Sequence, residues 1–166
     1  MPAPPVGKKV PAFTVATTAT PKLTSQDLKG RPYVLYFYPK DDTPGCTLEG
    51  KDFRDLHADF AKLKVRVLGV SRDSLASHAK FKGKYELPFE LVSDADEKLC
   101  GQFDVIKDKN MYGRKVRGIE RSTFLVDADG VLRREWRKVK VNGHAAEVLK
   151  AAAELRTERT GRAKGR

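Results

Sequence analysis

Cysteine is scarce in this sequence of 166 residues, and long apolar runs are absent. The chain has 2 cysteines, too few to staple a small scaffold through disulfide bonds. Its opening segment, Met1–Pro11, contains several prolines and no apolar stretch, so we expect no secretory signal peptide. No segment is long and apolar enough to span a bilayer. Together, these absences predict a protein of the reducing cytoplasm with no membrane partner.

Histidine is almost as rare, with 3 residues in the chain. No spacing among the cysteines and histidines is typical of a metal centre, so we predict no metal and no cofactor. His78 shares a face of a predicted helix with Leu75, Phe81 and Tyr85. On such a stripe a histidine is expected to be a core or boundary residue rather than a catalyst.

Charge is plentiful and unbalanced, with a formal net charge of +11. Part of the excess lies in residues 156–166, which lack apolar periodicity and are expected to form a basic, disordered tail. Such a charge allows weak nonspecific binding to polyanions, including nucleic acid. No nucleic-acid motif or interleaved aromatic residues accompany it. We therefore favour a solvated basic surface, and we assign residues 1–155 to one domain.

The apolar pattern predicts an α/β fold of a single domain. A continuous apolar strand at 33–38 is followed by alternating helix and strand patterns, which favour parallel pairing with helical crossovers. The Asp-Gly sequence at 129–130 predicts a hairpin between the last two strands. Residues 104–118 are expected to be a long, basic, exposed connection. The expected strands are 13–17, 33–38, 65–70, 89–92, 122–126 and 131–136, and the expected helices are 44–64, 74–85, 95–103 and 145–155.

Cys46 stands where the 33–38 strand gives way to a helix. Thr43 suits the N-cap and Pro44 the first helical position, which places Cys46 near position N3. A thiolate there would meet free backbone amides and the positive end of the helix dipole. Gly45 leaves room beside the sulfur for a small substrate. The pattern predicts a nucleophile with its own anion pocket, against the alternative of a small buried hydrophobe.

These residues carry a family resemblance. Pro39, Thr43 and Cys46 stand in the Pro-x-x-x-Thr-x-x-Cys arrangement of the peroxiredoxins, and residues 37–47 resemble the bacterioferritin comigratory protein, or Q-type, branch. Later landmarks of that branch are also present. They are residues 68–73, 91–94 and 118–127.

The resemblance implies a thioredoxin-like fold and a thiol peroxidase that reduces hydrogen peroxide and organic hydroperoxides. It makes Cys46 the peroxidatic cysteine, Thr43 the hydroxyl that bonds peroxide and sulfur, and Arg121 the cation that holds both. Glu49 lies on the Cys46 face one turn further along and is a weaker candidate for orienting Arg121. Pro39 and Gly45 are candidate supporting residues. The Q-type resemblance also favours a monomer.

The chain departs from the branch in its second cysteine. Where many members carry a resolving cysteine, this sequence has Lys51, and the next predicted helix, 74–85, contains none. Cys100 is the remaining candidate. Either Cys100 forms a disulfide with Cys46 that a thioredoxin-like partner reduces, or thioredoxin, glutaredoxin or glutathione attacks the oxidised Cys46 directly. We favour the second route, because Cys100 shares an apolar register with Leu99 and Phe103.

Two other functions compete with the peroxidase. A thioredoxin-like disulfide oxidoreductase is disfavoured, since Cys46 is followed by Thr47, Leu48 and Glu49 and the chain has no Cys-x-x-Cys pair. A basic nucleic-acid-associated protein with an incidental cysteine is the non-enzymatic alternative, and it is compatible with peroxidase activity.

Overall fold

The computed structural model describes residues 3–164, except for the side chains of Met111 and of residues 156–164. Its strands are β1 (Thr14–Thr17), β2 (Leu23–Thr24), β3 (Tyr33–Phe37), β4 (Arg66–Ser71), β5 (Glu90–Ser93), β6 (Ile106–Met111), β7 (Arg114–Ile119), β8 (Ser122–Val126) and β9 (Leu132–Trp136). Its helices are the 3-10 helix η1 (Ser25–Leu28), α1 (Pro44–Asp55), α2 (His57–Lys62), α3 (Leu75–Lys84), α4 (Lys98–Gln102) and α5 (His144–Lys164).

Seven strands form one mixed sheet in the order β2-β1-β5-β4-β3-β8-β9. β3, β4 and β5 are parallel neighbours, as expected for strands joined by helical crossovers. β1 and β8 run antiparallel to this central group. The predicted α/β class with a mixed sheet flanked by helices is therefore confirmed.

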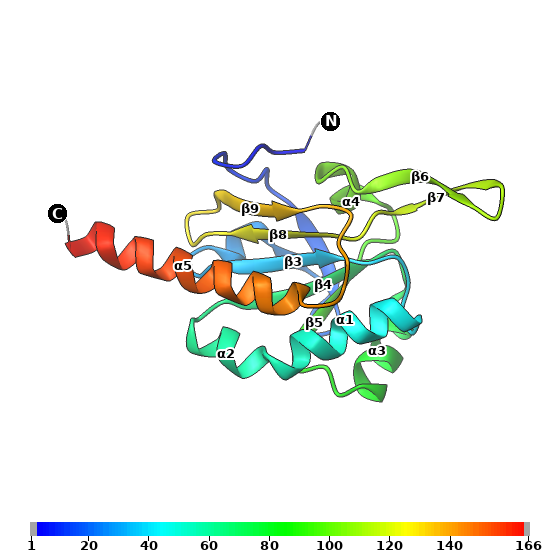
Figure 1. The fold of residues 1–166 in the computed structure, drawn as a ribbon, viewed down its shortest axis with the longest axis horizontal. Coiled ribbons are helices and arrows are strands. Elements are labelled where there is room, and N and C mark those ends of the chain that lie inside the picture. Colours follow the sequence, from blue (N-terminus) through cyan, green and yellow to red (C-terminus); the bar gives the residue numbers. More distant parts are fainter. Residues whose placement is uncertain (1–2, 165–166) are drawn as a thin grey trace.

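Alternation along β3 divides the core into two layers. Val34 and Tyr36 point into the layer that also contains Cys46 and residues of α1, α2, α3 and α5. Leu35 and Phe37 point into the other layer, which contains η1, α4 and the strand β1. Figure 1 shows α1, α2 and α5 together on one side of the sheet, with α4 on the other. β3 is buried along its whole length because both layers cover it.

Residues 104–118 differ from the prediction. They contain most of the hairpin β6–β7, which extends from the body of the protein (Figure 1). Charged residues are frequent in both strands, β7 is exposed over residues 114–117, and Tyr112 is fully exposed at the tip. No apolar alternation marks them, and the pattern for a half-buried strand is therefore missing.

Two helix boundaries also differ. The helix predicted over 44–64 is interrupted at Leu56, which separates α1 from α2. The last helix continues through Lys164, whereas the sequence predicted its end at Leu155. The backbone of residues 156–164 is thus helical, and the division into a domain and a basic, polyanion-binding tail stays a prediction. Among the residues described, no helix combines the length and apolar character that crossing a membrane requires.

Candidate active site

The turn between β3 and α1 presents Cys46 at the start of a helix. Thr43 has the extended backbone of an N-cap and Pro44 is the first helical residue, so Cys46 occupies N3 as predicted. The Thr43 side chain makes no capping bond. Its hydroxyl donates instead to the carbonyl of Lys40 at 2.9 Å. The hydroxyl oxygen is then oriented as an acceptor, and the first-turn amides are not taken up by their own cap.

Arg121 reaches this turn because of the sheet topology. β8 runs antiparallel to β3, and its first residue, Ser122, pairs with Phe37 at the end of β3. The residue before β8 is therefore brought to the turn that follows β3. The Arg121 carbonyl is fixed in turn by the amide of Val139 at 3.0 Å.

The Arg121 guanidinium joins two groups on α1. Nη2 donates to Cys46 Sγ at 3.4 Å, and Nη1 donates to Glu49 Oε1 at 2.6 Å. Cys46 and Glu49 are 2% and 1% exposed. A delocalised cation beside a buried sulfur stabilises negative charge on that sulfur. Three residues predicted from the sequence therefore meet at one point.

Gly45 lies directly beside the guanidinium. A Cβ built at this position would lie 3.1 Å from Arg121 Nη2, so the guanidinium would have to shift by a few tenths of an ångström. The Nη2 that would shift is the one that contacts Cys46. Pro39 is half-buried at the beginning of the same turn.

Glu49 is held in an apolar setting. Burial raises the pKa of its carboxyl to about 7, although the charge of Arg121 opposes the shift. Oε1 accepts from Arg121, whereas Oε2 has no hydrogen-bond partner among the described residues. Glu49 therefore holds the guanidinium through Oε1 while its Oε2 stays buried.

Two features of the site were not found from the sequence. Lys109, on β6, lies close enough for its charge to interact with Cys46 and Arg121, and burial lowers the pKa of its amine. Its ammonium group donates to the carbonyl of Ile119. The second feature is a buried polar cluster around Asp41 and His78, behind the Cys46 turn. Neither the basic hairpin nor residues distributed over separate elements produce a local sequence motif.

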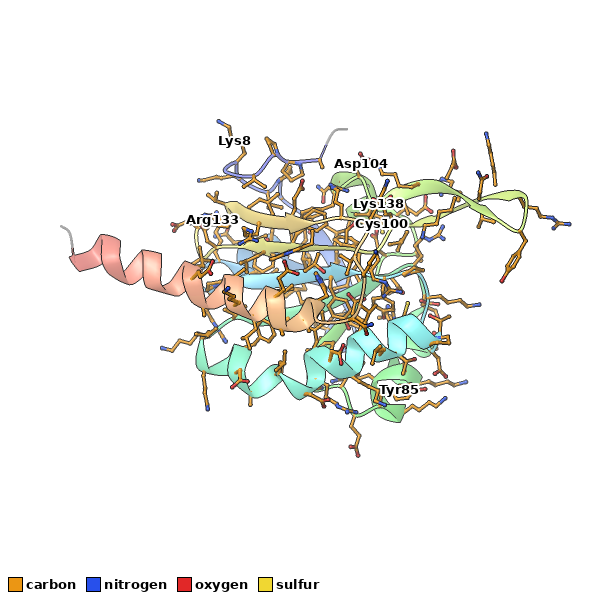
Figure 2. The ribbon with its side chains drawn as sticks, in the orientation of Figure 1. Lys8, Tyr85, Cys100, Asp104, Arg133 and Lys138 are labelled. Carbon is orange, nitrogen blue, oxygen red and sulfur yellow. The ribbon has the colours of Figure 1, made fainter. Side chains whose placement is uncertain are left out.

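Cys100 is placed apart from this site. It is fully buried in the core layer on the opposite face of the sheet from Cys46. In Figure 2, Cys100 lies with Asp104 on the α4 side of the sheet, away from Tyr85 at the end of α3. Burial, together with a hydrogen bond to Asp94, raises the pKa of the Cys100 thiol well above its ordinary value. The fold thus keeps the two thiols on separate faces.

Residues 6–135 match the model of the AhpC/TSA family. The chain belongs to the AhpC/TSA family. Among its relatives, Peroxiredoxin Bcp of Bacillus subtilis (strain 168) is 49% identical over 150 residues, which cover 90% of this chain and 96% of that protein. Peroxiredoxin Bcp of Xanthomonas campestris is 60% identical over 118 residues, or 71% and 74% of the two chains.

Solved structures agree with these sequence matches. The bacterioferritin comigratory protein of Xanthomonas campestris superposes with a TM-score of 0.82 at 50% identity, covering 87% of this chain and 92% of that one. A mutant of Xylella fastidiosa PrxQ gives a TM-score of 0.86 at 43% identity, with coverage of 91% and 96%. This chain is a peroxiredoxin of the Bcp and PrxQ branch with a thioredoxin-like fold, and its activity is that of a thiol peroxidase.

Proposed function

We propose that Cys46 is the peroxidatic cysteine of this peroxiredoxin and that an external thiol, rather than Cys100, recycles it. The contact of Cys46 with Arg121 at the N-terminus of α1 supports the first part. The location of Cys100 in the opposite core layer supports the second.

In the peroxide step, the Cys46 thiolate attacks one oxygen of the hydroperoxide. The S–O bond forms as the O–O bond breaks, and the leaving oxygen takes a proton and departs as water or an alcohol. Cys46 is oxidised to a sulfenic acid. Arg121 and the first-turn amides stabilise charge on the oxygens. The Thr43 hydroxyl donates a hydrogen bond to the Lys40 carbonyl. Its oxygen then accepts a hydrogen bond from the peroxide O–H.

We propose hydrogen peroxide and organic hydroperoxides as substrates. The Xanthomonas campestris relative has been studied for alkyl peroxide reduction. Cys46 packs in a largely apolar core layer, which keeps bulk water away from the sulfur.

Reduction of the oxidised Cys46 then begins with a thiol from another molecule. A thiol attacks the sulfur of the Cys46 sulfenic acid, which releases water and forms a mixed disulfide, and a second thiol releases Cys46 as a new disulfide forms. Thioredoxin, glutaredoxin and glutathione are the proposed reductants, in a reducing cytoplasm and with the protein as a monomer. Cys100 does not supply the attacking sulfur in this proposal.

The test is the intact mass and free-thiol count after one equivalent of hydrogen peroxide, beside Cys46→Ser. We expect one added oxygen at Cys46, trapping by a sulfenic-acid reagent, and a Cys100 that still reacts as a free thiol after denaturation. Loss of both thiols without added oxygen would instead make Cys100 the resolving partner. No rapid reaction at Cys46 would overturn the assigned peroxidatic role.

A further inference from the structure

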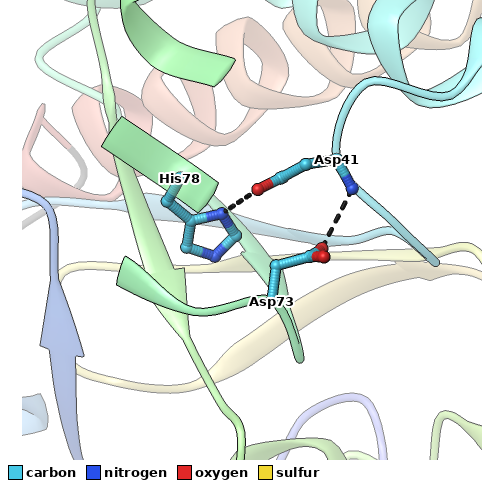
Figure 3. A group of neighbouring side chains, drawn as sticks. All are labelled: Asp41, Asp73 and His78. Carbon is cyan, nitrogen blue, oxygen red and sulfur yellow. Dashed lines mark hydrogen bonds and ion pairs between the residues drawn. The ribbon is translucent and has the colours of Figure 1, made fainter. Parts of the chain in front are cut away.

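A buried polar cluster holds the turn that precedes Cys46. The Asp41 side chain, 4% exposed, accepts hydrogen bonds from three groups on other parts of the fold. Tyr38 donates its hydroxyl at 2.6 Å, Ser77 its hydroxyl at 2.8 Å, and His78 faces Asp41 through Nδ1 at 2.8 Å. Figure 3 shows the two contacts that link Asp41 to His78 and to Asp73. The turn is thereby tied to α3.

Hydrogen bonds occupy both ring nitrogens of His78. His78 Nε2 lies 2.9 Å from the carbonyl of Val92, and because a carbonyl only accepts, Nε2 carries a proton. Nδ1 lies 2.8 Å from Asp41 Oδ2, so both ring nitrogens of His78 have hydrogen-bond partners. Both carboxyl oxygens of Asp41 are also hydrogen-bonded. Such pairing is what makes buried polar groups tolerable.

The backbone of Asp41 is fixed separately. Its amide donates to Asp73 Oδ2 at 2.9 Å, and Ser71 donates its hydroxyl to the same oxygen at 2.5 Å. Ligand atoms of Asp41, Asp73 and His78 lie within 4.8 Å of one another, close enough to share a metal ion. The nearest carboxylate oxygens and Nδ1 are already used in hydrogen bonds, so the cluster is an anchor rather than a metal site.

The anchor connects to the site through one carbonyl. Lys40 directly precedes Asp41, and its carbonyl accepts the Thr43 hydroxyl. We infer that Asp41 and His78 are positioning residues of the peroxidase, an inference that rests on the proposed function. They fix the Lys40 carbonyl, which orients the Thr43 oxygen toward peroxide, and they hold the first turn of α1 closed over Cys46.

A closed turn has opposite effects on the two half-reactions. Peroxide is small, and it reacts best when Thr43, Arg121 and the amides are in place. A thiol reductant must bring its sulfur to a side chain that is only 2% exposed, so the turn has to open before it can attack. Loosening the anchor should therefore slow oxidation of Cys46 and speed its reduction.

The experiment measures both half-reactions in Asp41→Asn, His78→Gln and Ser77→Ala. Oxidation is followed by rapid quench and mass spectrometry with hydrogen peroxide, and reduction of isolated Cys46 sulfenic acid is followed with glutathione. We expect oxidation to fall on the order of 10- to 100-fold in Asp41→Asn and His78→Gln, with less change in Ser77→Ala. We expect reduction to become several-fold faster.

The matched control is His144→Gln. His144 is also buried and is hydrogen-bonded to Thr123 at 2.8 Å, and its ring packs against Phe53 of α1 and Trp136. It lies on the Cys46 side of the sheet but outside the Asp41 cluster, so its loss tests the general cost of removing a buried histidine from this layer. Unchanged oxidation in the Asp41 and His78 variants, or two half-reactions that change in the same direction, would overturn the inference. Ser77→Ala keeps the test decisive if the other variants fail to fold. Failure of the proposed function would appear already in the wild type, as no sulfenic acid at Cys46.

Discussion

The two cysteines occupy the same helical position in two different settings. Cys46 is the third residue of α1 and Cys100 the third residue of α4, and both are buried. At α4, the Asp94 carboxylate accepts the amides of Leu99 and Cys100 at 3.0 and 2.7 Å. At α1 the Thr43 side chain makes no capping bond, and a guanidinium faces the sulfur.

The comparison shows that an N-terminal position does not by itself create a nucleophile. A helix N-terminus stabilises the anion that accepts hydrogen bonds from its free amides. In α4 that anion is Asp94, whose negative charge also opposes a thiolate on Cys100. In α1 the amides remain for the thiolate and its substrate, and the nearest side-chain charge, that of Arg121, is positive. The identity of the cap and the sign of the neighbouring charge separate the two thiols.

Arg121→Met should have the largest effect on the reactivity of Cys46. The variant removes the cation and the donor from Cys46, and we expect the rate of Cys46 oxidation to fall on the order of 10²- to 10³-fold. Arg54→Met is the control, because Arg54 lies on α1 with Cys46 but binds Asp55 and the Tyr85 carbonyl. Rapid-quench oxidation by hydrogen peroxide measures both. Equal rates in the two variants would contradict the role given to Arg121.

A glycine beside each thiol allows a smaller, matched change. In Gly45→Ala the new methyl group would meet Arg121 at 3.1 Å, whereas at Gly101 a Cβ meets nothing within 4 Å. We expect Gly45→Ala to slow peroxide reduction on the order of tenfold by displacing the guanidinium. Gly101→Ala should keep full activity and stabilise the fold by about 0.5–1 kcal/mol, since α4 loses a flexible residue. Peroxidase assays and urea unfolding distinguish the two outcomes.

Much of this site could be predicted because its signals are local. The apolar run of β3, the Thr-Pro start of α1 and the position of Cys46 follow one another within a few residues, and each has a physical signature in sequence. The β6–β7 hairpin gave no such signature, since charged residues occupy its exposed faces. The anchor of Asp41 and His78 was missed because its partners come from separate elements, and a buried histidine alone indicates only core.

The capping geometry illustrates the same limit at a finer scale. The sequence correctly placed Thr43 at the N-cap, yet its hydroxyl bonds Lys40 instead of the helix. Residue preference predicts which side chain stands at a helix start. The path of the preceding turn determines which acceptor the hydroxyl binds. Tertiary contacts fix that path.

Glu49→Gln should remove a pH dependence of the free energy of unfolding that arises from this carboxyl beside Arg121 and Cys46. The folded pKa of Glu49, about 7, lies above its ordinary value of 4.5, so the folded state binds this proton more tightly than the unfolded state. The free energy of unfolding should therefore fall as pH rises between these values, by up to about 1.4 kcal/mol per pH unit. Gln cannot titrate, and the variant should lack this slope.

Urea unfolding at pH 5, 6 and 7 tests the Glu49 prediction. Glu154→Gln, at an exposed position on α5, is the control and should keep the wild-type slope. A Glu49→Gln protein with the same pH dependence as the wild type would mean that another group titrates in this range.

Cys100→Ala is expected to have the smallest effect of all. Its thiol lies in the apolar layer of Phe37, Phe103 and Phe124, and Asp94 keeps its two amide partners when the sulfur is removed. Loss of a small buried side chain should lower the free energy of unfolding by about 1 kcal/mol, while turnover with an external thiol stays at the wild-type rate. Turnover that collapses in Cys100→Ala would mean that the sheet does not keep the two thiols apart during catalysis. Unchanged turnover would mean that the buried Cys100 serves only in packing. The reactivity of Cys46 would then come from the uncapped amides of α1 and from Arg121, because both cysteines occupy the same position in their helices.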